Sequence, residues 1–319
     1  MIGRRVILGA ALLAMTAVAI GASAQAQQYP EGRITMVVGF GAGGMTDVTS
    51  RMLAAKLEKL LGTTVIVENK AGAGGVLAIN SVGQMTADGH TMVSLLADGP
   101  FTAAYQGRPI NLADWAIIGG YMPQERVLFA AKTAPFASAQ EMMTYAKTNH
   151  VTVSDGGSFW SARVIEAFAK KHGLQIAVVA QRSGQAASTE VLGGHVTMAE
   201  TGTGTPAWSA AKGGELKILA ALTSGGLGAF GMAEIPTLEK LGADFVPRVY
   251  YGYAVRAATP PDRIAKLRAA FKVAVDDPDV QAQMKRIDLT PQWIEPKAYE
   301  ETLRKVVDDA ARLKEYLGK

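Results

Sequence analysis

The stretch "GFGAGGMTD", residues 39–47, decides how this chain is interpreted. It follows an apolar run, residues 34–38, and leads into a helical pattern that extends to residue 61, while Glu68 ends the next apolar run. Three of its glycines fit G-x-G-x-x-G, so strand, turn, helix and acid together match the dinucleotide-binding fingerprint. A glycine turn before a helix also presents backbone N–H groups to any anion. The stretch therefore predicts an anion site, and a nucleotide is one option among several.

Two further glycine turns have the same setting. They are "ENKAGAGG" (68–75) and "SDGGS" (154–158), and each follows an apolar run and precedes a helical pattern. The alternative for any single turn is tight packing of a strand against a helix, which also favours glycine. Ligands of open parallel sheets lie beyond the carboxyl ends of the strands, where all three turns fall. Together they favour a ligand held in a cleft.

The N-terminus has the pattern of a secretory signal peptide. Arg4 and Arg5 precede an apolar stretch, residues 6–22, which is followed by two A-x-A cleavage motifs within 22–26. The run is short for a membrane anchor of about 20 residues. We therefore predict a signal peptide over residues 1–26 and an exported mature protein. The arginine pair keeps twin-arginine export open beside the general secretory route.

Composition excludes several classes of function. The chain has no cysteine, so no disulfide or thiolate chemistry is expected, and its basic residues are too dispersed for a nucleic-acid partner. Without the predicted leader, 30 cations and 28 anions give a net charge of +2. No G-x-S-x-G motif suggests a hydrolase, and no metal or cofactor is predicted. The four histidines lack the spacing of zinc ligands: His90, His150, His172 and His195.

Short β-type runs alternate with helical patterns along the mature chain, which predicts parallel α/β layers. The alternation forms two blocks, and a strand near residues 249–255 returns the chain to the first block. No Pro- or Ser-rich linker separates the blocks, which favours a hinged clamshell. We predict one lobe from residues 27–125 and 250–319 and a second lobe from residues 126–249.

Several motifs resemble one family in order along the mature chain. They are "GAGGMTD" (41–47), "VENKAGAGG" (67–75), "TADGHT" (86–91), "VLGGHVTMAE" (191–200) and "ATPPDRIAKL" (258–267). They resemble the substrate-binding proteins of tripartite tricarboxylate transporters, the Bug family. The resemblance implies a type II periplasmic binding fold, with two α/β lobes and an interdomain ligand cleft. It also implies a non-enzymatic periplasmic protein that carries a small organic carboxylate to the integral membrane subunits of such a transporter.

The resemblance further implies that two loops grip one carboxylate of the ligand when the lobes close. Carried over to this chain, the first loop supplies Phe40, Gly41, Ala42, Gly43, Thr46 and Asp47. The loop that opens the second lobe supplies Ser154, Ser158, Phe159 and Ser161.

This chain departs from the family pattern around the expected cleft. The family's usual "SAGNGTSSH" is "SDGGSFWSA" here (154–162), its "YKG" loop contains Arg182, and Thr201 lies in a segment that is acidic elsewhere. We therefore hypothesise a carboxylate with a bulky, even aromatic, body. Phe159, Trp160 and Tyr250 would form its apolar wall, and Arg182 would pair with a second carboxylate. The alternatives are a core position for Trp160 and a solvated surface position for Arg182.

Two other functions stay open at this point. One is a ligand sensor of the same fold that signals to a membrane receptor. The other is an exported, dinucleotide-dependent oxidoreductase, although Glu68 begins a family element and is expected to cap or pair locally rather than hold a ribose. We expect the mature protein to be a monomer.

Overall fold

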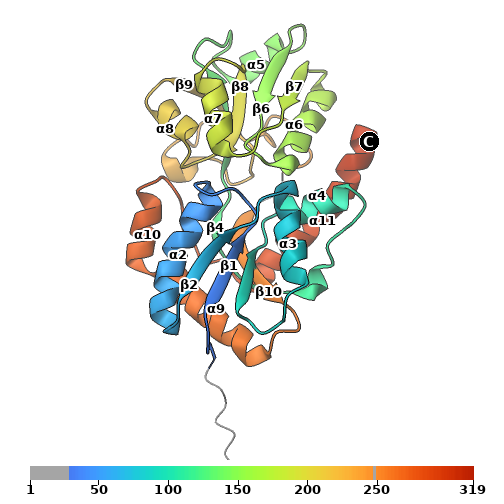
Figure 1. Ribbon diagram of the computed structural model, residues 1–319. Helices are drawn as coiled ribbons and strands as arrows, with labels where there is room; N and C mark the ends of the chain where they lie inside the picture. Colours follow the sequence, from blue (N-terminus) through green and yellow to red (C-terminus); the bar gives the residue numbers. More distant parts are fainter. Residues whose placement is uncertain (1–28, 247–248) are drawn as a thin grey trace, which may run out of the picture.

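The computed structural model describes residues 29–246 and 249–319, so the predicted signal peptide lies outside the described residues. Two five-stranded sheets, each covered by helices, form two lobes stacked one above the other (Figure 1). Strands and helices alternate through most of the chain, as the sequence pattern predicts. The sheets are mixed rather than purely parallel.

The lobe that contains the N-terminal strand, here the first lobe, is built in two passes of the chain. The first pass contains β1 (Ile34–Val38), α2 (Met45–Leu61), β2 (Val65–Asn69), η2 (Ala73–Gly75), α3 (Val76–Gly83), β3 (Thr91–Ser94), α4 (Asp98–Tyr105), η3 (Leu112–Asp114) and β4 (Trp115–Pro123). The second pass contains β10 (Tyr250–Arg256), α9 (Pro261–Asp276), α10 (Pro278–Lys285) and α11 (Pro296–Leu317).

The second lobe is formed between these two passes. It contains β5 (Arg126–Ala131), α5 (Ala139–Tyr145), β6 (Val151–Ser154), α6 (Phe159–His172), β7 (Ile176–Val179), α7 (Gly184–Leu192), β8 (Met198–Gly202), α8 (Pro206–Lys212), β9 (Leu216–Ala221) and η4 (Gly228–Phe230).

The two sheets have matching topologies. The strand orders are β2-β1-β3-β10-β4 and β7-β6-β8-β5-β9, and only the fourth strand in each order runs antiparallel to its neighbours. That reversed strand is the one that arrives from the other lobe, since β5 follows β4 and β10 follows the second lobe. At the crossing, the Gln124 N–H donates to the Val249 carbonyl at 2.8 Å, so the two connecting segments lie side by side.

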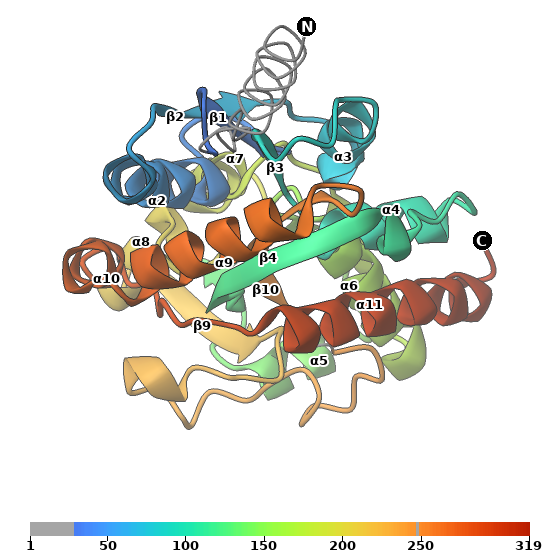
Figure 2. The ribbon, with the colours of Figure 1, turned by 90° about the horizontal axis from the view of Figure 1, so that it is seen from below.

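Strand alternation supplies both faces of each sheet with apolar side chains. In β1, Met36 belongs to the core under α2 and α9, whereas the next residue, Val37, belongs to the core under α3 and α11. In β5, Leu128 and Phe129 divide in the same way between the two faces of the second sheet. Figure 2 shows α2 and α10 on one side of the first lobe and α4 and the end of α11 on the other.

One hydrophobic core continues from lobe to lobe. Phe101 of α4 and Leu313 of α11 belong to the same buried cluster as Val153 and Phe168 of the second lobe. The end of α11 rises beside α6 (Figure 1), where the Lys170 Nζ donates to the carbonyl of Tyr316 at 2.6 Å. The lobes are therefore packed together on the α4–α6–α11 side.

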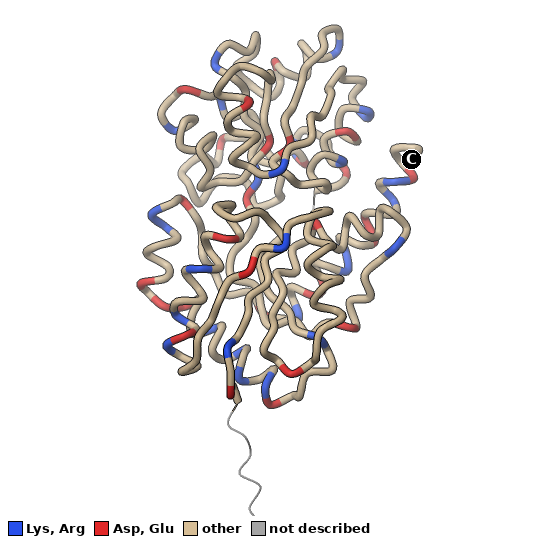
Figure 3. Tube along the Cα trace, in the orientation of Figure 1, with Lys and Arg blue, Asp and Glu red and all other residues tan. Residues whose placement is uncertain are grey.

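The surface carries both signs of charge. Lysines, arginines and carboxylates are interspersed over both lobes (Figure 3). Among the helices of residues 29–246 and 249–319, none has the length and apolar content that a membrane crossing needs.

Candidate ligand-binding site

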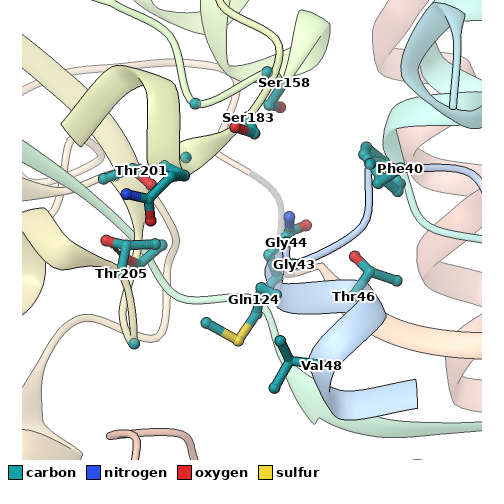
Figure 4. A pocket seen from close by; sticks show the side chains of 18 of the residues that line it. Phe40, Gly43, Gly44, Thr46, Val48, Gln124, Ser158, Ser183, Thr201 and Thr205 are labelled. Carbon is teal, nitrogen blue, oxygen red and sulfur yellow. Dashed lines mark hydrogen bonds between the residues drawn. The ribbon is translucent and has the colours of Figure 1, made fainter. Parts of the chain in front are cut away.

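A cavity of about 260 Å³ lies between the lobes (Figure 4). Residues of the first lobe and of the connection out of it line one part: Phe40, Gly41, Gly43, Gly44, Met45, Thr46, Val48, Leu96, Asp98, Gln124, Tyr251 and Ile287. The rest is lined by the second lobe: Arg126, Gly156, Gly157, Ser158, Arg182, Ser183, Gly184, Gln185, Thr201, Gly202, Gly204, Thr205 and Pro206.

Four helices begin at this cavity. Their N-cap residues are Gly44 of α2, Ser158 of α6, Ser183 of α7 and Thr205 of α8, and all four line it. Ser158 and Ser183 cap their own helices, and in α8, which begins with a proline, the Ala207 N–H donates to the Ser188 hydroxyl at 3.1 Å. No N-cap side chain accepts from the first N–H groups of α2. Helix N-termini carry partial positive charge and unsatisfied donors. Their convergence makes the cavity a site for an anion.

The first glycine loop is held from behind by charged and amide side chains. The Gly43 N–H donates to the Asp47 carboxylate at 2.9 Å, and Arg51 pairs with the same carboxylate at 2.8 Å. Burial alone would raise the pKa of Asp47, but the hydrogen bonds from Arg51 and Gly43 outweigh it and lower the pKa. The Asn69 side-chain amide donates to the Phe40 carbonyl at 3.1 Å. Asp47 and Asn69 thus fix the loop without lining the cavity.

The second glycine turn has a packing role. A Cβ on Gly39 would lie 2.7 Å from the Gly75 Cα, so the first two turns approach backbone to backbone. A Cβ on Gly74, whose φ is +64°, would lie 2.9 Å from the Thr102 hydroxyl of α4. This turn does not line the cavity, which corrects the expectation that all three turns face the ligand. Glu68 is exposed and lies 3.8 Å from the Lys70 ammonium.

A buried ion pair forms the floor of the cavity on the second lobe. Both oxygens of Glu200 accept from the Arg126 guanidinium, with Nη2 2.5 Å from Oε2, and the Ser161 hydroxyl adds a third bond at 2.7 Å. The two residues are diagonal neighbours on β5 and β8. Burial would lower the pKa of Arg126, but Glu200 outweighs burial and the pKa is raised. Pairing is what allows both charges to be buried.

Asp98 joins the lobes beside this ion pair. It lies in the first turn of α4 and accepts from the Ser158 hydroxyl at 2.5 Å and from the Trp160 N–H. Burial raises the pKa of Asp98, although Arg126 opposes the shift. Burial also raises the pKa of the neighbouring Tyr251 to about 12, again against the effect of Arg126.

Half of the predicted site residues line the cavity. These are Phe40, Gly41, Gly43, Thr46, Ser158, Arg182 and Thr201. The others lie elsewhere: Ala42, Asp47, Ser154, Phe159, Trp160, Ser161 and Tyr250. Asp47 supports the first loop and Ser161 supports Glu200, so both act one contact away from the cavity.

The expected apolar wall is not formed by its three predicted aromatics. Trp160 is 1% exposed and packs in the core of the second lobe. Phe159 packs against Phe101 and Tyr105, with the nearer ring centroid 5.4 Å away. The Tyr250 ring packs against another ring of the first lobe. Large aromatic side chains gain most from burial, and Trp160 obtains it fully while Phe159 and Tyr250 are partly buried against other rings.

Sequence reasoning missed seven polar residues of the site: Asp98, Gln124, Arg126, Ser183, Gln185, Thr205 and Tyr251. One of them had a signal. Arg126 opens an apolar strand, and Glu200, its partner, closes another. Opposite charges in two buried strands indicate that the strands bring them together.

Comparison with known proteins agrees with this geometry. The model of the tripartite tricarboxylate transporter family receptor matches residues 49–318. The UPF0065 protein in the gbd 5′ region of Cupriavidus necator is 31% identical over 320 residues, which cover 98% of this chain and 95% of that protein. Protein BugT of Bordetella pertussis is 26% identical over 264 residues, 80% of each chain.

Three solved structures share the fold. The periplasmic binding protein BugD has a TM-score of 0.79 at 23% identity, covering 91% of this chain and 99% of that one. Rpa4515 of R. palustris, solved with adipate, has a TM-score of 0.77 at 18% identity, covering 91% and 98%. MatC of Rhodopseudomonas palustris, solved with malate, has a TM-score of 0.75 at 21% identity, covering 91% and 100%.

These matches confirm the predicted two-lobed periplasmic binding fold and the predicted family. They also exclude the oxidoreductase alternative, because the family consists of solute-binding receptors and not of enzymes. The chain belongs to the tripartite tricarboxylate transporter receptor family, the Bug-type solute-binding proteins.

Proposed function

We propose that the mature protein, after removal of its signal peptide, is a monomeric periplasmic solute-binding protein. It captures a small organic carboxylate between its lobes and delivers it to the integral membrane subunits of a tripartite tricarboxylate transporter. The observation that carries the proposal is that the N-termini of α2 and α7 open onto one interlobe cavity that Arg182 also lines. A carboxylate there meets backbone donors and partial positive charge.

Two buried polar atoms support a polar ligand. The Thr201 hydroxyl and the Gln124 Oε1 line the cavity and have no hydrogen-bond partner in the described residues, although their side chains are only 1% and 3% exposed. Buried polar groups are rarely left unpaired. The hydroxyl can donate to a ligand oxygen, and the amide oxygen can accept from a ligand O–H or N–H.

The size of the cavity favours a compact acid. Its volume of about 260 Å³ lies below the range of roughly 300–1,000 Å³ typical of sites for drug-sized ligands. Malate and adipate, the ligands of two structural neighbours, are of this compact kind. We propose that the apolar body of the ligand packs on Phe40. Arg182, which lines the rim and forms no ion pair with any described carboxylate, would pair with a ligand carboxylate.

The proposed lobe boundaries, after residues 125 and 249, fall where the two connecting segments are hydrogen-bonded side by side. A hinge at this crossing would open the cavity while the α4–α6–α11 side stays packed. Ligand binding would then favour the closed arrangement, because donors of both lobes meet only there.

Gly41 offers a direct test of ligand binding. A Cβ at Gly41 would meet no atom of the described residues within 4 Å beyond its chain neighbours, so Gly41→Ala places a methyl group at the cavity with nothing there to displace. Residues 27–319 would be screened with mono-, di- and tricarboxylates by thermal shift and calorimetry. At 100 times Kd a ligand stabilises the folded state by roughly 2.7 kcal/mol. We expect Gly41→Ala to keep the melting temperature of the unliganded protein and to lose the ligand shift.

Gly32→Ala is the matched control, because its Cβ is equally free and it lies outside the cavity. If no carboxylate in the panel binds, the proposal is refuted. Delivery is tested separately by uptake of the identified ligand in a deletion strain. Loss of uptake supports the transport role, whereas normal uptake with loss of a transcriptional or chemotactic response supports the sensor alternative.

A further inference from the structure

The N-terminus of α6 is already occupied by a carboxylate of the protein. Asp98 is fully buried in the first turn of α4, and it accepts from the Ser158 hydroxyl, at 2.5 Å, and from the Trp160 N–H. Ser158 is the N-cap residue of α6, a helix of 14 residues in the other lobe. Asp98 therefore reaches across the lobe interface and satisfies the donors at the start of α6. Without it, these donors would be available to an anionic group of a ligand.

Among the described residues, the charges beside Asp98 leave no unpaired cation for a second anion. Arg126 is bound through two nitrogens to Glu200, so its charge is already balanced. Asp98 and Glu200 are two carboxylates against this one guanidinium. Asp155, the next carboxylate of this region, is turned away from the cavity, where it accepts from the Gln181 N–H at 2.8 Å. The floor of the cavity thus carries an excess of negative charge.

Other groups that line the cavity can still donate to an anion. The N-terminus of α2 lacks a side-chain cap, the Thr201 hydroxyl has no partner among the described residues, and Arg182 is exposed at the rim. Near the floor, the Gln124 amide is hydrogen-bonded to Tyr251 but keeps its Oε1 without a partner. An unpaired acceptor there calls for a donor on the ligand.

We propose that Asp98 acts as a built-in carboxylate that excludes a ligand carboxylate from the α6 end of the cavity, so that the protein selects acids whose inner end is an uncharged hydrogen-bond donor. A hydroxyl or a primary amide fits that end, while the ligand carboxylate lies toward the N-terminus of α2 and Arg182. The inference rests on the proposed function, and it names the class of acid that the site takes.

Matched pairs of dicarboxylates and their half-amides test this selection, because each pair has the same size and differs by one charge. Succinate and succinamate, glutarate and glutaramate, and adipate and adipamate would be titrated calorimetrically into the mature protein at neutral pH. For the chain length that binds best, we expect the half-amide to bind about tenfold more tightly than the diacid. Asp98→Asn keeps an acceptor for Ser158 and removes the charge. In this variant the Kd values of the diacid and its half-amide should therefore agree to within about threefold.

Asp309→Asn is the control, since Asp309 is also a buried carboxylate but lies on α11 away from the cavity, and it should keep the wild-type ratio. A wild-type protein that binds the diacid as tightly as its half-amide overturns the inference while leaving the proposed function intact, even where Asp98→Asn fails to fold. An Asp98→Asn variant that folds and keeps the tenfold ratio overturns it as well. Failure of every carboxylate to bind removes both proposals.

Discussion

Lys212 of the second lobe and Asp288 of the first lobe form an ion pair across the cleft, with Nζ 2.5 Å from Oδ2. Lys212 ends α8, and Asp288 follows α10. Close by, a Cβ on Gly204 would lie 2.7 Å from the Ile287 carbonyl, so the lobes also touch at their backbones. In this arrangement of the lobes, these contacts join the α8 side of the cavity and the Asp98–Ser158 hydrogen bond joins the α4–α6 side.

Lys212→Ala should weaken ligand binding through this arrangement without touching the ligand. The two side chains are 41% and 30% exposed, so the pair is worth about 0.2–1 kcal/mol. We expect Kd to rise by up to about fivefold at low salt and by less at high salt, because salt screens exposed charges. Calorimetry at two ionic strengths, with Asp288→Ala and the double variant, measures the coupling. Unchanged affinity of Lys212→Ala at low salt would contradict the prediction.

Asp47→Asn should loosen the first glycine loop. The lowered pKa of Asp47 means that its carboxylate stabilises the folded protein fully above the unfolded value, near 3.9, and that this contribution is lost as pH falls through the folded pKa. The variant should therefore be less stable than wild type at pH 6 and approach it below about pH 4. Urea unfolding across this range, with exposed Glu68→Gln as a control, provides the measurement. A pH-independent difference would argue against the charged contact.

Arg126→Met should be strongly destabilising because it leaves Glu200 buried without its cation. Breaking a buried ion pair by removing one partner costs about 3–5 kcal/mol. Arg126→Met combined with Glu200→Leu should recover much of that loss, since neither charge then remains buried. Urea unfolding of the two single variants and the double variant forms a double-mutant cycle. Additive losses would show that the pair is not a coupled unit.

Trp160→Ala should damage the core and spare the ligand preference. Truncating a fully buried Trp costs about 3–5 kcal/mol of folding free energy. Phe40→Ala is the contrasting variant, because Phe40 is only half-buried and lines the cavity, so it should lose affinity with a smaller loss of stability. Chemical unfolding and titration with the best-binding carboxylate separate the two effects. A changed order of ligand preference in folded Trp160→Ala would restore the aromatic-wall hypothesis.

Much of the fold follows from local pattern. The spacing of apolar residues predicts α11 over 296–317 and α8 over 206–212 with the observed ends. It does not predict α4, whose residues 98–103 are all buried and so show no amphipathic period, and which contains Gly99 and Pro100. Nor does periodicity reveal that β5 and β10 run antiparallel to their neighbours, because alternation is the same in either direction.

The site could be predicted where it depends on local geometry. The first glycine loop and Ser158 begin helices, and their place at the cavity follows from their place at the ends of strands. The register of α6 decides which way its other side chains point. It places Trp160 in the core, although Trp160 was expected beside Phe159 on the wall of the cavity. Arg126 and Glu200 are 74 residues apart, so only the pairing of β5 with β8 brings them together.

The apolar cluster that α4, α6 and α11 share has a consequence for folding. Neither lobe has a complete hydrophobic core of its own, because the last turns of α11 cover part of the second lobe. Val306, Ala310 and Leu313 are therefore fully buried only when both lobes are folded. The two halves should therefore melt as one cooperative unit in a single calorimetric transition. A chain that ends before α11 would lose structure in both lobes at once, even though α11 is far in sequence from most of the core residues that it covers.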